Sequence, residues 1–385
     1  MTFEFATAGR IRFGPGVSAE VGALAAEFGS RALLVRGGSA AAAGRVAPVR
    51  QSLQRAGLSL TEFDLSGEPT IDLARRGAAA ARAAGVDLVV GCGGGSVLDA
   101  GKAIAALATN PGDPLDYLEV IGRGQPLTRD PLPLIALPTT AGTGSEVTRN
   151  AVLGSAEHGV KASLRHARML PRVALVDPEL TAGLPPAISA ACGLDALTQL
   201  IEPLVSTKAN PIADALARAG LPLAARALPR VCRSPEDPEA RGDMALASLL
   251  AGLAMANAGL GAVHGFAAAI GGAFTAPHGA VCAALLAPVT AVNLAALRAR
   301  GPADRLARYD EAARLLTGSP EAVADDAVTW LRALTAELAI APLAAWGVEP
   351  RHHADLATKA ARANSMKANP LVLTSAELRQ ILETA

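Results

Sequence analysis

The chain has 385 residues, of which 51% are hydrophobic and 18% are charged. This composition excludes a largely disordered protein, and the length exceeds what one hydrophobic core usually serves, so we expect two domains. Lys plus Arg and Asp plus Glu both number 35. Such a balance argues against partners that are recruited by charge, namely nucleic acid and acidic membranes, and favours a small-molecule ligand.

Short apolar runs alternate with alanine-rich segments through the first half of the chain. Buried strands are predicted at residues 31–37, 86–95, 133–140 and 172–178. The segments 79–85 and 98–110 between them are rich in helix-forming residues. This alternation is typical of βαβ units around a parallel sheet.

Long Ala/Leu segments replace the strand-like runs after residue 187. Pro185 and Pro186 suit the start of a helix. We therefore predict an α/β domain over residues 1–183 and an all-helical domain over 184–385. The polar segment 233–243 is predicted to be an exposed loop.

No Asp, Glu, Lys or Arg occurs between Asp243 and Arg298. A membrane-spanning helix is one interpretation of such a stretch. However, the polar residues Asn257, His264 and His278 interrupt it, and they suit lipid poorly. We expect a buried helical core and no membrane span.

The four cysteines, Cys92, Cys192, Cys232 and Cys282, form no CxxC pair. This spacing argues against a disulfide scaffold or a zinc ribbon and fits a reducing compartment. The first residues, MTFEFATAGRIRFGPG, lack the basic flank and apolar run of a secretory signal. A cytoplasmic protein is expected.

A glycine-rich turn, VVGCGGGSVLDAGKA at 89–103, follows a predicted strand and opens a predicted helix. Gly93, Gly94 and Gly95 would let a phosphate approach the backbone N–H groups at the positive end of that helix. The turn does not fit GxGxxG cleanly, and a plain tight turn is the alternative explanation.

A second loop of this kind lies at 136–153, ALPTTAGTGSEVTRNAVL. Its small hydroxylated residues can bond ribose or phosphate oxygens, although a loop that satisfies its own backbone is the alternative. Two such loops at strand ends of one sheet favour a dinucleotide over a single phosphate.

Asp195 and Gln199 lie four residues apart in GLDALTQLIE, so they share one face of a helix. His264 and His278 both fall in the charge-free stretch, and each is followed by glycine. Together with the Asp/Gln face they could complete a four-ligand metal shell, although an amide oxygen is a weak ligand for a transition metal. His158, His166, His352 and His353 lie in polar contexts and receive no role.

Seven motifs taken in chain order resemble the signatures of the iron-containing, group III alcohol dehydrogenases of the dehydroquinate synthase-like superfamily. They are GGGSVLDAGKAIA, NPGDPLDYLEVIG, LPTTAGTGSEVT, MLPRVALVDPELT, GLDALTQLIEPLVS, VHGFAAAIGGAFTAPHGA and SMKANPLVLTSAEL. The resemblance implies an N-terminal dinucleotide-binding domain, an all-helical C-terminal domain, and an NAD(P)-linked alcohol dehydrogenase that uses Fe²⁺ or Zn²⁺.

The resemblance also assigns individual residues. It implies metal ligands at Asp195, Gln199, His264 and His278, and catalytic roles for His278 and Lys161. Cofactor contacts are implied at Gly37, Gly38, Ser39, Gly93, Gly94, Gly95, Ser96, Asp99, Thr139, Thr140, Ser145, Lys161 and Leu180. Lysine is scarce in this chain, and Lys102 and Lys367 fall inside the motifs.

The chain departs from the family pattern at three places. Gln199 stands where the family usually has a histidine ligand, which predicts weaker metal retention. Ala268 stands where many members carry an active-site histidine. Gly37, Gly38 and Ser39, next to Arg36, stand where NAD-preferring members often place an aspartate, so the pocket is open to NADP.

Three other kinds of function compete with a metal-dependent dehydrogenase: a metal-independent reductase, a lyase and a non-catalytic protein. Gln199 favours a metal-independent reductase that resembles maleylacetate reductases, whereas the three retained ligands oppose it. A dehydroquinate synthase-like lyase would need a basic pocket around the metal positions, and no Lys/Arg cluster occurs there. A non-catalytic protein would not need both phosphate loops. A small alcohol or aldehyde in an apolar chamber with Ala268, Phe266 and Phe274 is the expected substrate, and a homo-oligomer, a dimer or larger, is the expected assembly.

Overall fold

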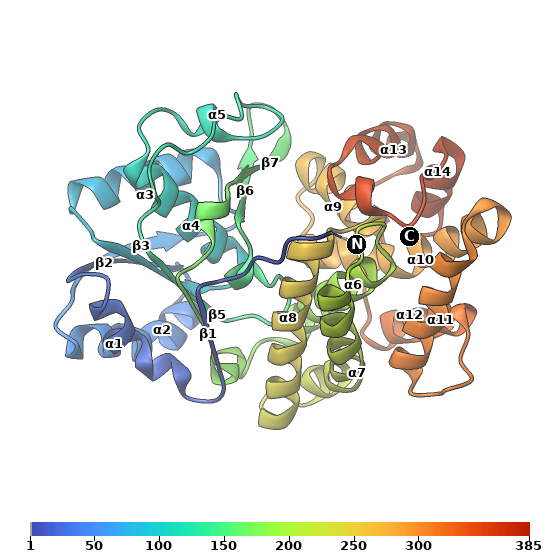
Figure 1. The fold of residues 1–385 in the computed structure, drawn as a ribbon, viewed down its shortest axis with the longest axis horizontal. Helices are drawn as coiled ribbons and strands as arrows, with labels where there is room; N and C mark the ends of the chain where they lie inside the picture. The colour runs from blue at the N-terminus through green and yellow to red at the C-terminus, as the bar shows by residue number, and fades with distance from the viewer. Residues whose placement is uncertain (1) are drawn as a thin grey trace. The chain divides into compact units, whose positions relative to one another are not determined.

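The structure is a computed structural model that describes residues 2–385. The chain divides into two compact units (Figure 1). Ala6–Ala182 form an α/β unit, and Gly183–Ala385, together with residues 2–5, form a helical unit. The predicted fold class, a parallel sheet followed by an all-helical part, is confirmed.

The α/β unit is built on six strands in the order β1-β8-β5-β4-β2-β3, and every neighbouring pair is parallel. The chain runs from β2 outward to β3, returns to β4 beside β2, and then continues in the opposite direction to β5. The direction of winding therefore reverses between β2 and β4, which is where doubly wound sheets bind ligands. The six strands are β1 (Arg10–Phe13), β2 (Arg31–Gly37), β3 (Ser59–Leu65), β4 (Leu88–Gly93), β5 (Leu134–Pro138) and β8 (Val173–Val176).

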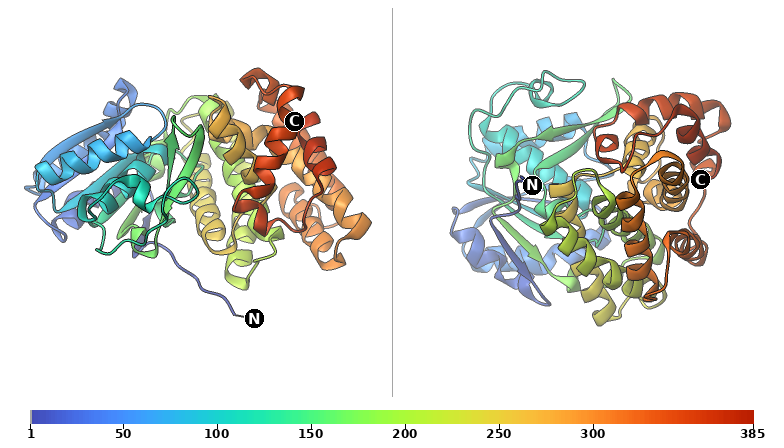
Figure 2. Two further views of the ribbon diagram at one scale, coloured as in Figure 1. Left: turned by 90° about the horizontal axis from the view of Figure 1, so that it is seen from above. Right: turned by 45° about the vertical axis from the view of Figure 1, so that its right-hand side comes forward.

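Helices cover both faces of this sheet (Figures 1 and 2). Alternate residues of β2 point to opposite faces, since Leu34 packs with α1 and α2, whereas Leu33 packs with α3 and α4. Strands buried on both faces must be apolar throughout, which explains why the sequence predicted β2, β4, β5 and β8. The helices are α1 (Val21–Ala26), α2 (Ala40–Arg55), α3 (Ile71–Ala83), α4 (Gly95–Thr109) and α5 (Pro114–Tyr117).

Four strands were not predicted from the sequence. β1 and β3 are the two edge strands of the sheet, and most of their residues are exposed or half-buried, so they lack a continuous apolar run. The other two, β6 (Asn150–Ser155) and β7 (Val160–Arg165), form an antiparallel hairpin.

The helical unit contains no strand among its described residues. Its first helix begins at Pro186, as the two prolines predicted. The predicted loop at 233–243 is wrong for most of its length, because Pro238 starts a helix that Asp237 caps at its N-terminus. The helices are α6 (Pro186–Val205), α7 (Pro211–Arg233), α8 (Pro238–Ala258), α9 (Ala262–Ala273), α10 (His278–Arg300), α11 (Ala303–Thr317), α12 (Ala324–Glu337), α13 (His353–Arg362) and α14 (Ser375–Glu383).

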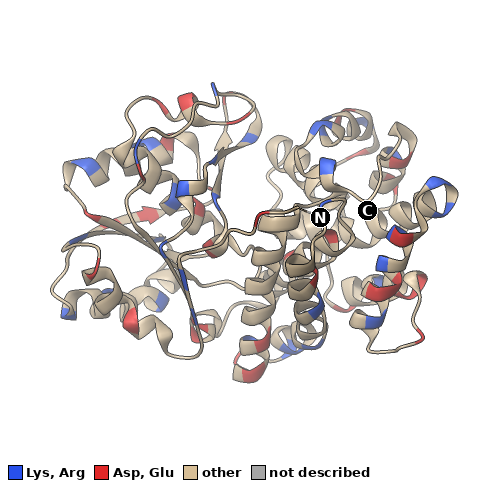
Figure 3. Ribbon diagram, in the orientation of Figure 1, with Lys and Arg blue, Asp and Glu red and all other residues tan. Residues whose placement is uncertain are grey.

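The charge-free stretch forms α9, most of α8 and all but the last turns of α10 (Figure 3). By length and composition alone, α6 and α10 are apolar enough to cross a membrane, and α8 with α9 would count as a bent pair. Their apolar windows are 83% and 78% buried inside the protein for α6 and α10. This burial is what a core helix requires, and it agrees with the expected buried core.

Candidate metal and nucleotide sites

Helix α6 presents three polar side chains to the core of the helical unit. Asp195, Gln199 and Glu202 lie at spacings of four and three residues, so they project from one side of the helix. All three are buried, Asp195 and Gln199 at 1% and 2% exposure. Buried polar groups on an otherwise apolar helix are costly unless they have partners.

The partners of Asp195 are two imidazoles from α9 and α10. His264 Nε2 lies 3.3 Å from Asp195 Oδ1, and His278 Nε2 lies 3.8 Å from the same oxygen. The two rings are 5.5 Å apart between centroids and inclined by 51°. The side chain of His278 is 37% exposed, whereas that of His264 is 8% exposed, so the cluster is open on the His278 side.

Glu202 holds the far side of the His264 ring. Its Oε2 lies 2.7 Å from His264 Nδ1, and its Oε1 accepts a hydrogen bond from the backbone N–H of Val263 at 2.8 Å. A carboxylate at Nδ1 keeps a proton on that nitrogen, so Nε2 is the atom that would bind a cation once its own proton has left. Burial of the imidazole lowers its pKa, but Glu202 and Asp195 outweigh that effect and raise the pKa of His264 to about 10.

Two buried oxygens in this cluster lack a hydrogen bond. They are Asp195 Oδ1 and Gln199 Oε1. Burial raises the pKa of Asp195, but the contact with His264 at 3.3 Å and the charges of both imidazoles outweigh it, so the net pKa is lowered and the side chain is a carboxylate. An ionised, unsatisfied oxygen facing two imidazole nitrogens fits a divalent cation.

The structure adds a residue that the sequence analysis did not name. One ligand atom from each of Asp195, His264, His278 and Cys282 lies within 4.8 Å of every other. Cys282 follows His278 by four residues on α10, so the same spacing rule that drew attention to Gln199 would have found it. Gln199 itself lies beside Asp195 and lowers the pKa of that carboxyl as a hydrogen-bond partner.

The glycine-rich turn lies where β4 meets α4, next to the point at which winding reverses. Gly94 is the N-cap of α4, and no side chain caps this helix end. A Cβ atom on Gly95 would lie 2.6 Å from Thr143 Cγ2, so the turn and the loop after β5 approach too closely for a side chain. An uncapped helix end with this close approach suits a phosphate group.

Several predicted cofactor residues also hold this region together. Asp99 accepts hydrogen bonds from Ser145 Oγ at 2.6 Å and from the backbone N–H of Val152 at 2.9 Å. Lys102 is fully buried, lies 3.0 Å from Asp99 Oδ1, and donates to the backbone oxygen of Ser145. These contacts fix the loop after β5 against α4, so Asp99 and Ser145 have a positioning role.

The remaining predicted cofactor residues are found at the same edge of the sheet or near it. Thr139 directly follows β5 and donates its N–H to Gly93 O, and Ser39 caps α2 by accepting from Ala42 N–H. Lys161 on β7 lies 3.5 Å from Glu68 Oε2. Leu180, in a 3₁₀ turn at Pro178–Thr181, packs into the core beneath the sheet. Its side chain therefore contributes to packing.

The expected apolar chamber is only partly borne out. Phe266 is fully buried and belongs to the core of the helical unit. Phe274 is half-buried and packs edge-on against His352, with ring centroids 5.1 Å apart. Ala268, one turn beyond His264 on α9, is exposed.

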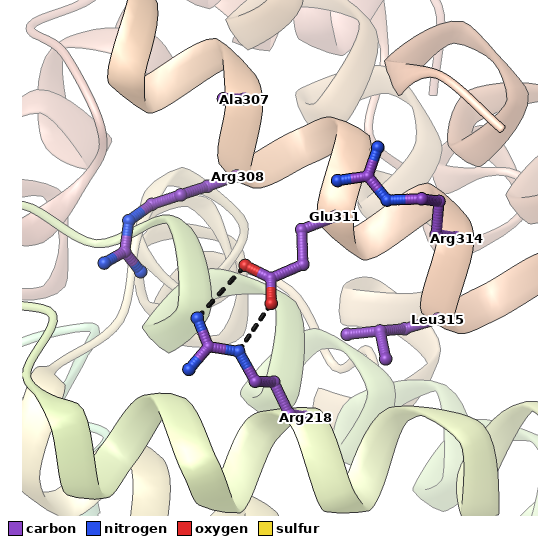
Figure 4. A pocket seen from close by; sticks show the side chains of 6 residues that line it. All are labelled: Arg218, Ala307, Arg308, Glu311, Arg314 and Leu315. Atoms are coloured by element: carbon purple, nitrogen blue, oxygen red, sulfur yellow. Dashed lines mark hydrogen bonds and ion pairs between the residues drawn. The ribbon is translucent and has the colours of Figure 1, made fainter. Parts of the chain in front are cut away.

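A separate hollow of about 460 Å³ lies elsewhere on the helical unit (Figure 4). Its arginines Arg218 and Arg308 are already paired with carboxylates, Glu311 and Asp214. None of the predicted site residues lines it. The lining residues are Arg218, Ala307, Arg308, Glu311, Arg314 and Leu315.

Comparison with known proteins decides the family. Residues 8–178 match the iron-containing alcohol dehydrogenase family, and residues 189–385 match the C-terminal part of the Fe-containing alcohol dehydrogenase family. The chain belongs to the iron-containing alcohol dehydrogenases. The predicted resemblance is thereby confirmed.

Individual relatives agree with this assignment. The chain is 36% identical to the probable alcohol dehydrogenase EutG of Escherichia coli over 96% of this chain and 90% of that protein. It is 41% identical to the 1,3-propanediol dehydrogenase of Klebsiella pneumoniae over 74% and 73% of the two chains.

Among solved structures, a 1,3-propanediol oxidoreductase superposes with a TM-score of 0.92 at 34% identity, covering 100% of this chain and 99% of that one. A sulfoacetaldehyde reductase from Bifidobacterium kashiwanohense, solved with NAD⁺, gives a TM-score of 0.85 at 30% identity, covering 100% and 98%. This protein is thus an oxidoreductase, an NAD(P)-linked alcohol dehydrogenase of the metal-dependent kind.

Proposed function

We propose that this alcohol dehydrogenase interconverts a small, uncharged alcohol and its aldehyde, accepts NADP(H) as well as NAD(H), and requires a divalent cation held by Asp195, His264 and His278. The observation that carries this proposal is the buried, ionised Asp195 Oδ1, which faces two imidazole nitrogens and has no hydrogen bond. A cation would satisfy all three groups at once.

Each residue of the cluster has a different role in catalysis. Glu202 orients His264, Asp195 supplies the negative charge that retains a cation, and the exposed side of His278 leaves access for a substrate oxygen. When bound, the cation would polarise that oxygen as a Lewis acid, and the nicotinamide would give or accept the hydride. The glycine turn at Gly94 would hold the pyrophosphate through backbone N–H groups.

Acceptance of NADP is supported by the end of β2. Gly37, Gly38 and Ser39 place no carboxylate there. On the neighbouring strand β3, Arg36 pairs with Glu62 at 2.8 Å and with Asp64 at 3.0 Å, and Arg50 also pairs with Glu62 at 2.7 Å. Their negative charge is therefore compensated, which lowers the barrier to a 2′-phosphate.

The substrate class is supported by the open side of the cluster and by the relatives. Ala268 adds neither charge nor bulk one turn from His264. Two of the compared proteins are named for 1,3-propanediol, which is a small and uncharged alcohol.

We also infer a cytoplasmic homo-oligomer, a dimer or larger. Val120 and Val372 are 92% and 90% exposed, and a subunit contact would remove such apolar side chains from water. No disulfide joins the four cysteines, all of which lie among the described residues, and this supports a reducing compartment.

The direct test is an aldehyde reduction assay with NADH and NADPH on protein purified without chelator. We expect turnover with short aldehydes, loss of turnover after dialysis against a chelator, and recovery when Fe²⁺ or Zn²⁺ is returned. Full activity in metal-free protein would instead support the metal-independent reductase that Gln199 favours.

A further inference from the structure

Cys282 lies inside the metal cluster although the family resemblance assigns it no role. It is fully buried on α10, and its Sγ lies 3.6 Å from His278 Nε2. The same His278 nitrogen is the one nearest to Asp195 Oδ1. Cys282 is therefore placed on the side of the ring that faces the cluster.

The separations within this cluster match those of a tetrahedral metal site. With metal–ligand bonds of about 2.0 to 2.3 Å, adjacent ligand atoms of a tetrahedron lie roughly 3.3 to 3.8 Å apart. The distances are 3.3 Å from Asp195 Oδ1 to His264 Nε2, 3.8 Å from Asp195 Oδ1 to His278 Nε2, and 3.6 Å from Cys282 Sγ to His278 Nε2. The remaining pairs of ligand atoms lie within 4.8 Å of each other, so the four groups would draw closer together around an ion.

Gln199 is the weaker candidate for the fourth ligand. Its amide is a hydrogen-bond partner of Asp195, and the only atom it could offer to a cation is Oε1, a neutral oxygen without a hydrogen bond. A neutral amide oxygen is also a poor donor to Zn²⁺ or Fe²⁺, whereas a thiolate is charged and is favoured by Zn²⁺.

We propose that Cys282, as a thiolate, is the fourth protein ligand of the metal, in place of the histidine that the family has at the position of Gln199. This inference rests on the proposed function, because it assumes that Asp195, His264 and His278 hold a cation. Binding releases one proton from the Cys282 thiol and one from Nε2 of the His264 imidazolium to solvent, and it leaves a site with two anionic and two neutral ligands. Such a site selects Zn²⁺ over Mg²⁺ or Mn²⁺, since soft ligands disfavour those hard ions.

Cobalt reports the ligand directly, because a Co²⁺ ion bound to thiolate absorbs in the near ultraviolet by charge transfer from sulfur. The full-length protein is stripped of metal and titrated with Co²⁺, alongside Cys282→Ser, Gln199→Leu and Cys192→Ser. Cys192 is the matched control, because it lies on α6 one turn before Asp195 and is outside the ligand cluster. We expect the sulfur band in the wild type, Gln199→Leu and Cys192→Ser, and its loss in Cys282→Ser.

Zinc affinity provides a second readout. Competition with a coloured chelator should show a loss of at least tenfold in Cys282→Ser and a smaller loss in Gln199→Leu. If Cys282→Ser does not fold, X-ray absorption of the wild-type zinc protein should still show one sulfur neighbour at about 2.3 Å.

The outcomes separate this inference from the function on which it rests. A wild-type protein that binds Co²⁺ and reduces aldehydes, but shows no sulfur band or keeps the band in Cys282→Ser, overturns the role of Cys282 and leaves the proposed function standing. A protein that binds no divalent metal at this cluster overturns both.

Discussion

Glu202 is the side chain that determines which nitrogen of His264 faces the metal cluster. It contacts His264 Nδ1 at 2.7 Å and the N–H of Val263 at 2.8 Å, so it ties the ring and the start of α9 to α6. Sequence inspection passed over it because a glutamate three residues after Gln199 resembles an ordinary helix residue. Only the fold brings it beside a histidine 62 positions away.

Replacing Glu202 by Gln should weaken metal binding. The amide keeps the size of the side chain but loses the charge that strengthens the imidazole as a ligand, and changes to such supporting residues typically cost about 10–100-fold in affinity. Metal affinity measured by chelator competition checks this, with Glu311→Gln as the control because Glu311 pairs with Arg218 outside the cluster. Equal metal affinities in both variants and the wild type would show that Glu202 does not support metal binding.

Replacing Ser39 by Asp should discriminate between the two nicotinamide cofactors. Asp caps a helix as well as Ser does, so α2 should be preserved, but the new charge would repel a 2′-phosphate. Repulsion of about 1 kcal/mol or more at about 4 Å predicts a loss of roughly fivefold or more in NADPH affinity and little change for NADH. Ser39→Asn is the neutral control. A parallel change for both cofactors in Ser39→Asp would place the 2′-phosphate elsewhere.

At the scale of elements, the start of α10 is held against α6 by close backbone contact. A Cβ atom on Gly279 would lie 2.7 Å from the backbone oxygen of Ala191. Because that oxygen belongs to a helix backbone, it cannot move aside as a side chain could. Gly279 thus allows His278, the first residue of α10, to reach the cluster.

Gly279→Ala should therefore lower both stability and metal affinity. Overpacking of this kind costs about 1–3 kcal/mol, and the displaced helix start should carry His278 with it. The control is Gly242→Ala in α8, where a Cβ atom meets nothing within 4 Å. That change should be neutral or stabilise by up to about 1 kcal/mol. Urea unfolding and chelator competition measure the two effects; an unperturbed Gly279→Ala variant would contradict the packing argument.

Sequence patterns predicted the elements that are buried on both faces, and they failed where burial is partial. β4 is apolar throughout and β2 has the apolar centre ALLV, whereas the edge strands β1 and β3 alternate apolar with polar or charged residues and were missed. The same limit applies at the site. Asp195, His264 and His278 stood out as polar residues in apolar helices, but Cys282 resembles a small apolar residue and was passed over.

At the scale of the whole molecule, the free energy of unfolding should depend on pH because the carboxyl group of Glu146 is buried. Burial raises the pKa of Glu146 to about 7, above its usual value of 4.5. A folded-state pKa above the unfolded one favours the protonated group in the fold, so this contribution is complete below about pH 4.5 and is lost as the pH rises through about 7.

Glu146→Gln should remove that dependence. We expect the variant to match the wild type near pH 5 and to exceed it near pH 8, where the wild type must bury a charge. Urea unfolding of both proteins across this range measures the difference. Parallel stability profiles would mean that Glu146 stays ionised throughout, held by the neighbouring charge of Lys102.

The central claim is that the Asp195, His264 and His278 cluster holds a metal that catalysis requires. Its most direct test is elemental analysis of protein purified without chelator, combined with aldehyde reduction assayed on the same sample before and after metal removal. We predict close to one Fe or Zn per chain and activity that falls and returns with that metal. Full activity in a sample shown to contain no metal would contradict the account.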